Sequence, residues 1–421
     1  MKLIQFLIPV LFLFVVGSSF AQVNEGRRIT KELCSPKYFG RGYVKGGDSL
    51  AAIYLASEFQ QKGIKPLKKS YFQPFTFDVN TFPGAMELVL NGQILVPGKD
   101  FMVDDNSGGF HGEWNFKILS QNEIFDFDST RKVVQAIQQS IYNSIVIDIR
   151  NYRGDSLKTA KSIAKAVTEI ASALVITDEK FTFSVGSEPM NFPMIFIQGS
   201  SYKSALKIHC NIDQKLKKKH VANNVIACIP SSNKKADYLV FTAHYDHLGG
   251  MGSETYFPGG NDNASGTSML FTLADHFKEN PVPYHVLFIA FAGEEAGLIG
   301  SKHFVDHPLM DLKKIKFLLN LDIMGSGEEG ITVVNATLFP TQFDKLDSIN
   351  KQENYLTTIK KRGPAANSDH YWFTEKGVPA FFFYTMGDNK HYHDVFDTYE
   401  ELSFNKYDAI VKLIADFAKT F

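Results

Sequence analysis

From about residue 220 onward, the sequence alternates between short, largely apolar runs and segments with helical spacing. The apolar runs are 225–229, 238–242, 285–291, 317–321 and 380–384, and the helical segments are 265–277, 296–305, 341–352 and 404–417. Strands that are apolar on both faces are covered by helices on both sides of their sheet. We therefore predict an α/β fold built on a doubly wound, mostly parallel sheet.

The residues ahead of this alternation have a different pattern. A helical segment at 48–63 is followed, from about residue 83 to 214, by short strands, turns and one helical stretch at 157–170. A chain of 421 residues also exceeds what one core usually supports. We expect 22–82 to begin the main domain, 83–214 to be a smaller inserted α/β domain, and 215–421 to complete the main domain.

The first 21 residues are typical of a secretory signal. Lys2 precedes an apolar run over 3–16, and small residues lead up to Ala21. The run is shorter than the ~20 residues that span a bilayer. We expect cleavage after Ala21, no stable membrane insertion afterwards, and an exported protein that is periplasmic or secreted.

Charge and cysteine content exclude several classes of protein. The formal net charge is −1, which disfavours nucleic acid as a partner. The only cysteines are Cys34, Cys210 and Cys228, too few for a disulfide scaffold, and they lie outside the polar segments described next. Export would permit one disulfide, with Cys210 and Cys228 the nearer pair. The lysine cluster 215–219 indicates a solvated connection.

Five polar segments, most of them at the end of an apolar run, carry residues of the types that bind metal. The segments are 242–246, 260–263, 293–295, 320–322, and 392–393 followed by Asp397. Sites in open α/β sheets form at the carboxyl ends of the strands, so these segments are expected to meet. Carboxylates crowded into one crevice repel each other unless cations neutralise them. Imidazole and carboxylate ligands without thiolate favour zinc, with Co²⁺ or Mn²⁺ as substitutes.

The residues suffice for two zinc ions if Asp262 bridges them. His244 and Asp322 would complete one set of ligands, and Glu295 and His393 the other. Glu294 is then free to act as general base on a water held between the ions. Asp246, two residues after His244 on the same side of an extended chain, is expected to orient that imidazole. Each residue alone also has an ordinary explanation, as a core histidine, a helix start or a turn. It is their joint occurrence that predicts the metal site.

These motifs resemble those of the exported di-zinc exopeptidases, which include bacterial leucyl aminopeptidase, aminopeptidase Y and glutamate carboxypeptidase II. The resemblance runs over 238–249, 261–266, 291–301, 319–325, 368–370 and 392–398. It implies the same roles for the residues assigned above and a cis peptide bond between Asp262 and Asn263. By the same resemblance, 83–214 is similar to a protease-associated domain, on weaker motifs; an unrelated lid is the alternative.

Two departures from the compact aminopeptidases concern the oxyanion. Those enzymes tend to carry a tyrosine three residues before the Ser-Asp-His segment, where this chain has Ala365. The closing motif 392–400 looks more like the glutamate carboxypeptidase branch, in which the tyrosine before the histidine ligand takes that role. The resemblance thus implies Tyr392 as the oxyanion stabiliser. The alternative is that Tyr392 only packs beneath the metal site.

The predicted function is a zinc-dependent exopeptidase, most simply an aminopeptidase acting on the N-terminal residues of peptides. A carboxypeptidase of the glutamate carboxypeptidase type is the first alternative. Arg362 is the only arginine after Asp246, so no arginine cluster favours an acidic C-terminal residue. A glutaminyl cyclase with one zinc is a second alternative, and a non-catalytic receptor module, which would have lost ligands or base, is a third.

Overall fold

The computed structural model of the protein describes residues 22–204 and 207–421. The signal sequence predicted for residues 1–21 lies outside the described residues. Within the described ranges, no helix combines the length and the apolar character needed to cross a membrane.

A nine-stranded mixed sheet organises the larger part of the molecule. In spatial order its strands are β1 (Lys65–Pro66), β12 (Lys215–Ile229), β16 (His285–Phe291), β13 (Tyr238–His244), β17 (Ile315–Leu321), β20 (Ala380–Met386), β18 (Gly330–Val334) and β19 (Ile359–Lys361), and β2 (Phe72–Thr81) pairs with β12. The four central strands, β16, β13, β17 and β20, are parallel. Strands β12 and β18 join this centre antiparallel. The predicted doubly wound sheet is confirmed, with a parallel centre and antiparallel flanks.

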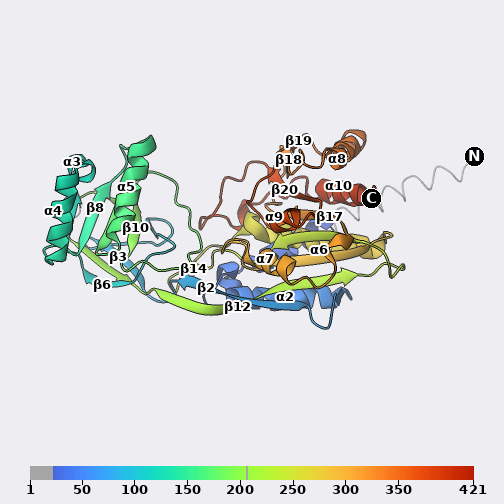
Figure 1. Cartoon of the computed structure of the whole chain (residues 1–421), viewed down its shortest axis with the longest axis horizontal. Coiled ribbons are helices and arrows are strands. Elements are labelled where there is room, and N and C mark those ends of the chain that lie inside the picture. Colours follow the sequence, from blue (N-terminus) through green and yellow to red (C-terminus); the bar gives the residue numbers. More distant parts are fainter. Residues whose placement is uncertain (1–21, 205–206) are drawn as a thin grey trace, which may run out of the picture.

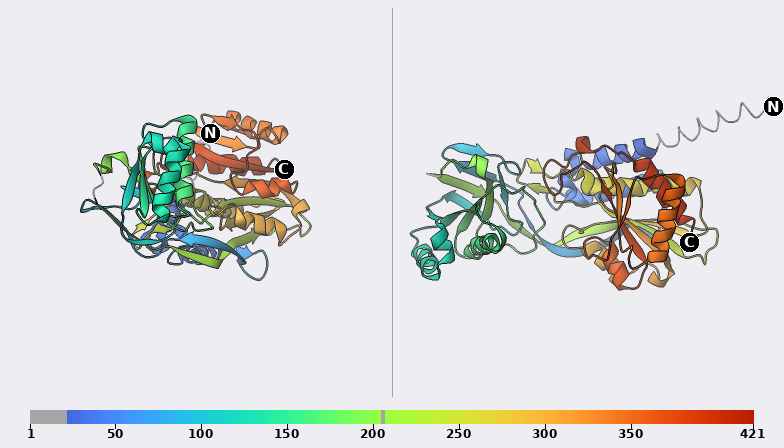
Figure 2. Two further views of the ribbon diagram at one scale, coloured as in Figure 1. Left: turned by 60° about the vertical axis from the view of Figure 1, so that its left-hand side comes forward. Right: turned by 90° about the horizontal axis from the view of Figure 1, so that it is seen from above.

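Helices cover both faces of this sheet (Figure 2). They are α2 (Gly47–Gln61), α6 (Gly266–Glu279), α7 (Ile299–Asp306), α8 (Pro340–Glu353), α9 (His370–Glu375) and α10 (Tyr407–Ala418). Phe241 of β13 packs in one core with residues of α2, α6, α8 and α10, whereas its neighbour Val240 packs on the other face with residues of α7 and α9. Adjacent residues of a strand point to opposite faces, so runs that are apolar at every position fit a sheet buried on both sides.

Residues 86–212 form two smaller sheets of their own. One has the order β5 (Phe101–Val103), β10 (Met194–Gln198), β9 (Ser172–Thr177), β8 (Ser144–Asp148), β7 (Phe116–Leu119); the other has β4 (Gln93–Leu95), β3 (Met86–Leu90), β11 (Ile208–Ile212), β6 (Phe110–Glu113). Helices α3 (Gln121–Phe125), α4 (Phe127–Gln138) and α5 (Gly154–Val167) complete this part. We call it the insert; it lies to the left in Figure 1 and is joined to the rest by β2 and β12.

The lysine cluster 215–219 corrects one expectation. It does not lie in an irregular connection but begins β12, which pairs antiparallel with β2 from Lys215 to Val225, with a bulge between Lys217 and His220. Most of its side chains are exposed, so the segment lacks the apolar alternation that identifies a strand.

The three cysteines, Cys34, Cys210 and Cys228, are all buried and free. Cys210 and Cys228 therefore do not form the disulfide that export would permit.

The remaining elements are short. They are the ribbon β14 (Gly250–Met251) and β15 (Thr255–Tyr256) and the helical turns η1 (Pro36–Arg41), η2 (Gly199–Ser201), η3 (Gly260–Ser265), η4 (Leu312–Lys314) and η5 (Tyr399–Glu401). Within η3, the peptide bond between Asp262 and Asn263 is cis, as the resemblance implied.

Candidate metal centre

The carboxyl ends of the central parallel strands bring the predicted residues together. His244 is the last residue of β13, Glu294 and Glu295 follow β16, and Asp322 follows β17. Asp262 comes from η3 and His393 from the loop after β20. Parallel strands end at the same edge of their sheet, so residues at these strand ends and in the following loops lie close together.

Asp262 lies between the two histidines. Its Oδ1 is 3.3 Å from Nε2 of His244, and its Oδ2 is 3.1 Å from Nε2 of His393. On one side, Asp322 Oδ1 is 3.2 Å from His244 Nε2. On the other, Glu295 Oε2 is 3.2 Å from His393 Nε2. The side chains therefore form two groups of one imidazole and two carboxylates, and Asp262 belongs to both.

Burial gives this cluster unusual electrostatics. Asp262 and Asp322 are 4% and 6% exposed. Burial raises the pKa of Glu294 well above its ordinary value, and the charges of Glu295 and Asp322 add to the shift against the opposing charge of His244. Although burial works against it, contacts with His244 and His393 hold the pKa of Asp262 well below its usual range. Bound cations would relieve the repulsion among these acids, and the donor set of imidazole nitrogens and carboxylate oxygens fits zinc.

Asp246 contacts His244 differently from the expectation. Its main-chain oxygen, not its carboxylate, lies 3.1 Å from Nδ1 of His244; the nearest carboxylate oxygen is 3.9 Å away. The carboxylate instead accepts hydrogen bonds from Tyr43 Oη at 2.8 Å and from the main-chain N–H groups of Glu294 and Glu295 at 3.3 and 3.4 Å. These donors hold the carboxylate on the turn after β16, so Asp246 connects the two strand ends.

Further polar contacts hold the predicted ligands in place. Ser368 Oγ donates to Asp322 Oδ2 at 2.8 Å and accepts from the amide of Asn320 at 2.7 Å. The carboxylate of Asp397 accepts from the main-chain N–H groups of Asn261 and Asp262 at 2.9 to 3.1 Å. Asp397 therefore holds in place the main chain at Asp262.

His247 had no role assigned from the sequence. It is fully buried, and its Nδ1 lies 2.7 Å from Glu295 Oε1. With Asp262 and Glu295 it forms one of the clusters of possible metal donors among the described residues, and its Nε2 has no hydrogen-bond partner among them. The available signal was its position three residues after His244, directly after the segment 242–246.

Tyr392 lies at the edge of the cluster. Its side chain is 47% exposed, and its ring stacks on that of His393 with centroids 3.9 Å apart. Burial and the charges of Asp262 and Glu295 raise its pKa, so the hydroxyl keeps its proton and can donate a hydrogen bond.

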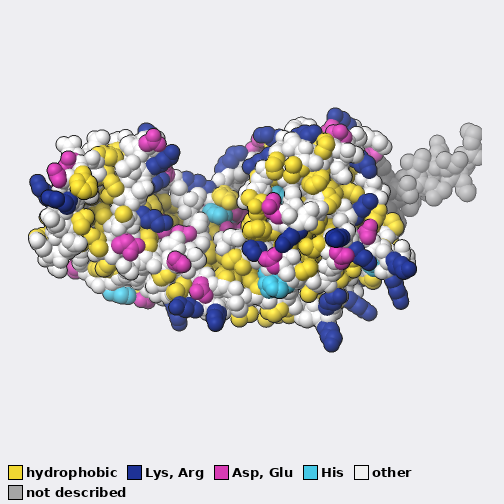
Figure 3. Space-filling model, viewed as in Figure 1, with side chains coloured by type: hydrophobic (Ala, Val, Ile, Leu, Met, Phe, Trp, Pro, Cys, Tyr) yellow, Lys and Arg dark blue, Asp and Glu magenta, His cyan; other side chains and the backbone are white. Residues whose placement is uncertain are grey.

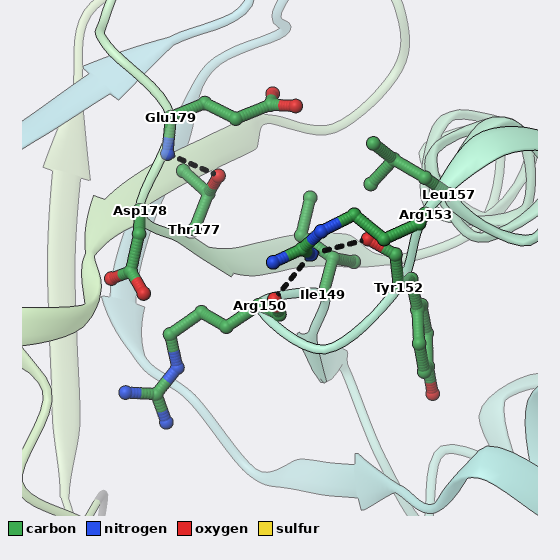
Figure 4. A pocket seen from close by; sticks show the side chains of 8 residues that line it. All are labelled: Ile149, Arg150, Tyr152, Arg153, Leu157, Thr177, Asp178 and Glu179. Atoms are coloured by element: carbon green, nitrogen blue, oxygen red, sulfur yellow. Dashed lines mark hydrogen bonds between the residues drawn. The ribbon is translucent and has the colours of Figure 1, made fainter.

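A cavity of about 180 Å³ opens onto this cluster. It is lined by His244, Asp262, Glu294, Asp322, Ile323, Arg362, Asn367, Phe382, Tyr384, Tyr392 and His393. A second cavity, of about 230 Å³, lies in the insert between the ends of β8 and β9 and the start of α5 (Figure 4). Its two arginines are already engaged, because Arg153 donates to the carbonyl groups of Arg150 and Tyr152 and Arg150 pairs with Asp148. The first cavity is therefore the candidate substrate site.

The fold and the site define an α/β protein with a candidate cation-binding centre at the carboxyl ends of its strands. Residues 224–418 match the profile of Peptidase family M28. Aminopeptidase YwaD of Bacillus subtilis (strain 168) is 33% identical over 162 residues, which cover 35% of this chain and 32% of that protein. A probable leucine aminopeptidase of Arthroderma otae is 28% identical over 221 residues, covering 49% of this chain and 59% of the relative. The chain thus spans about a third to three fifths of these relatives.

The fold comparison extends over nearly the whole chain. The structure of BSAP, a zinc aminopeptidase from Bacillus subtilis, superposes with a TM-score of 0.64 at 19% identity, covering 93% of this chain and 95% of that one. An alignment of this length includes the insert. The match of residues 224–418 to the model of Peptidase family M28 agrees with the motif resemblance to the di-zinc exopeptidases.

Proposed function

We propose that the protein is a zinc-dependent aminopeptidase that hydrolyses N-terminal residues of peptides. The observation that carries this proposal is the position of Asp262, which turns one carboxylate oxygen to each of two imidazoles, with Glu294 beside them. The names of its relatives, an aminopeptidase and a probable leucine aminopeptidase, support the same activity.

Each residue of the site has a separate proposed role as ligand, base or oxyanion donor. His244, Asp262 and Asp322 would hold one zinc ion, and Asp262, Glu295 and His393 the other. When bound, the ions polarise the peptide carbonyl and acidify water. Glu294, which faces the cavity and belongs to neither ligand set, would take the proton of the attacking water and pass it to the leaving amine. Tyr392 would donate to the oxyanion.

The proposal also covers the domain organisation of the chain and the location of the protein. We place a protease-associated-like domain at residues 83–214, inserted in a peptidase domain made of 22–82 and 215–421; the separate sheets of residues 86–212 support this division. We also propose that residues 1–21 direct export to the periplasm or the exterior. This rests on the apolar run after Lys2.

One observation favours the carboxypeptidase alternative. Arg362 lines the cavity, donates to Tyr384 Oη at 3.1 Å, and has no carboxylate partner among the described residues. An unpaired guanidinium in a peptide-binding cavity can pair with a carboxylate, either an acidic side chain or the C-terminus of the substrate.

The test measures how hydrolysis depends on zinc and on the C-terminal group of the substrate. The protein is stripped with a chelator, restored with zinc, and assayed on aminoacyl amides and on dipeptides with free or amidated C-termini. Aminopeptidase activity requires hydrolysis of the amides, whereas activity confined to free C-termini would replace it with carboxypeptidase activity. Elemental analysis that finds one tightly held zinc per chain would favour the cyclase. Arg362→Gln should selectively weaken hydrolysis of carboxylate-bearing substrates, with Lys361→Gln, outside the cavity, as the control.

A further inference from the structure

Residues 180–183 of the insert contact the loop that carries His393. Lys180 Nζ lies 2.7 Å from Asp394 Oδ2 and 2.9 Å from the carbonyl oxygen of Lys390. The Asp394 side chain is only 4% exposed. The ring of Phe183 is buried and stacks on Phe257, with centroids 4.9 Å apart and planes at 9°. Residues 180–183 of the insert are therefore docked on residues 390–394. Figure 3 shows the two lobes of the molecule and the narrower region that joins them.

The main chain of Phe183 holds His393 at two points. Its N–H donates to the carbonyl oxygen of His393 at 2.9 Å, and its own carbonyl oxygen lies 2.9 Å from His393 Nδ1. A carbonyl oxygen can only accept, so Nδ1 carries a proton, and Nε2, which faces Asp262 and Glu295, is the nitrogen left to bind a metal ion. The insert thus determines both the tautomer and the direction of this imidazole.

The backbone of His393 needs such support. Its φ angle is 54°, in the left-handed region that non-glycine residues rarely adopt. A residue keeps such a conformation only when its surroundings over-determine it. Here the surroundings are the hydrogen bonds to Phe183 and the ion pair between Lys180 and Asp394 in the next position.

The other imidazole is held without the insert. Nδ1 of His244 pairs with the carbonyl oxygen of Asp246, two residues further along the chain. Nδ1 of His393 pairs with a carbonyl group 210 residues away in sequence. Any movement of the insert that separates 180–183 from 390–394 would release His393 and leave His244 in place.

We propose that docking of residues 180–183 sets the zinc affinity of the group formed by Asp262, Glu295 and His393. Phe183 and Lys180 are positioning residues, and the insert controls occupancy of one of the two ion sites. The proposal rests on the two-ion centre proposed above. Its consequence is selective: undocking weakens one site and spares the group of His244, Asp262 and Asp322.

The experiment measures the two zinc affinities separately. Chelated full-length protein is titrated with zinc against a fluorescent zinc indicator, for the unaltered protein, Lys180→Met and Phe183→Ala. The control is Lys161→Met, which removes an ion pair at 2.5 Å to Glu179, the neighbour of Lys180, inside the insert. Both test variants should bind the second zinc about 10- to 100-fold more weakly, with the first unchanged, and excess zinc should restore hydrolysis.

The outcomes separate the two proposals. Second-site affinities equal to that of the unaltered protein in both variants would overturn the docking proposal alone. An unaltered protein that binds a single zinc would overturn the two-ion centre, and docking with it. Circular dichroism and thermal unfolding of the metal-free proteins show whether each variant is folded. Lys180→Met, at a half-exposed side chain, keeps the test valid if Phe183→Ala does not fold.

Discussion

Glu294 and Glu295 are adjacent in the chain, yet their surroundings shift the pKa values of their carboxyl groups in opposite directions. Burial raises the pKa of Glu294. The pKa of Glu295 is lowered against the effect of burial, because His393 and His247 lie beside it. Two carboxyl groups with pKa values driven apart are suited to different tasks. This supports Glu294 as the proton carrier and Glu295 as the ligand.

Glu294→Gln is expected to keep the metal and lose the reaction. The amide preserves size and hydrogen bonding but cannot take a proton from water, so kcat should fall about 10²- to 10⁴-fold. Zinc content measured by elemental analysis should equal that of the unaltered protein. A variant that retains full turnover would exclude Glu294 as the base.

Glu25 should make folding stability depend on pH. Hydrogen bonds and charges from Arg28 (Nε at 2.9 Å) and Lys62 (Nζ at 2.6 Å) lower its pKa to about 2. Because the pKa is lower in the folded state than in the unfolded chain, the stabilisation is complete above the unfolded pKa of about 4.5 and is lost as pH falls toward about 2.

The comparison that checks this is urea unfolding of the unaltered protein and Glu25→Gln across that pH window. At neutral pH the variant should be less stable by about 1 kcal/mol, a value reduced by the partial exposure of the network. The difference should shrink as pH falls. A difference that stays constant would mean that Glu25 stabilises the fold by packing rather than by charge.

The candidate site was largely predictable because it lies at the ends of strands that are buried on both faces. Apolar runs locate such strands, and a polar residue directly after a run stands at the edge where sites form. Element boundaries were less predictable. The helix expected to begin at 404 begins at Tyr407, after left-handed residues at Phe404 and Lys406, and the one expected from 296 begins at Ile299, after left-handed Leu298. Local apolar spacing does not reveal such conformations.

Contacts between distant segments were not predictable. Phe183 acts on His393 through main-chain atoms, which every residue type shares, so its side chain gives no sign of the contact. Strand β18 was also missed, although it is buried throughout, because it is short and joins the sheet antiparallel at the flank. The contact of Asp246 was also not predictable. Its spacing from His244 suggested that its carboxylate contacts the imidazole, but the carboxylate accepts a hydrogen bond from Tyr43, and His244 contacts the main-chain oxygen instead.

Tyr392→Phe tests the oxyanion role. Removing one hydrogen-bond donor to the oxyanion should raise the barrier by about 2.7 to 4 kcal/mol, which lowers kcat about 10²- to 10³-fold, with little change in KM. Tyr371→Phe, in α9 outside the cavity, serves as the matched control. Unchanged turnover of Tyr392→Phe would leave the tyrosine with only its stacking on His393.

His247 is expected to act through Glu295. Its Nδ1 lies 2.7 Å from Glu295 Oε1, so its loss should let that carboxylate turn away from His393 and weaken zinc binding about 10- to 100-fold. His247→Leu removes the donor, whereas His247→Asn places an amide nitrogen near the position of Nδ1. Zinc titration should show a weakened site in the leucine variant and substantial recovery in the asparagine variant. Equal weakening in both would mean that the unpartnered Nε2, rather than Nδ1, makes the important contact, and His247 would then be a candidate ligand.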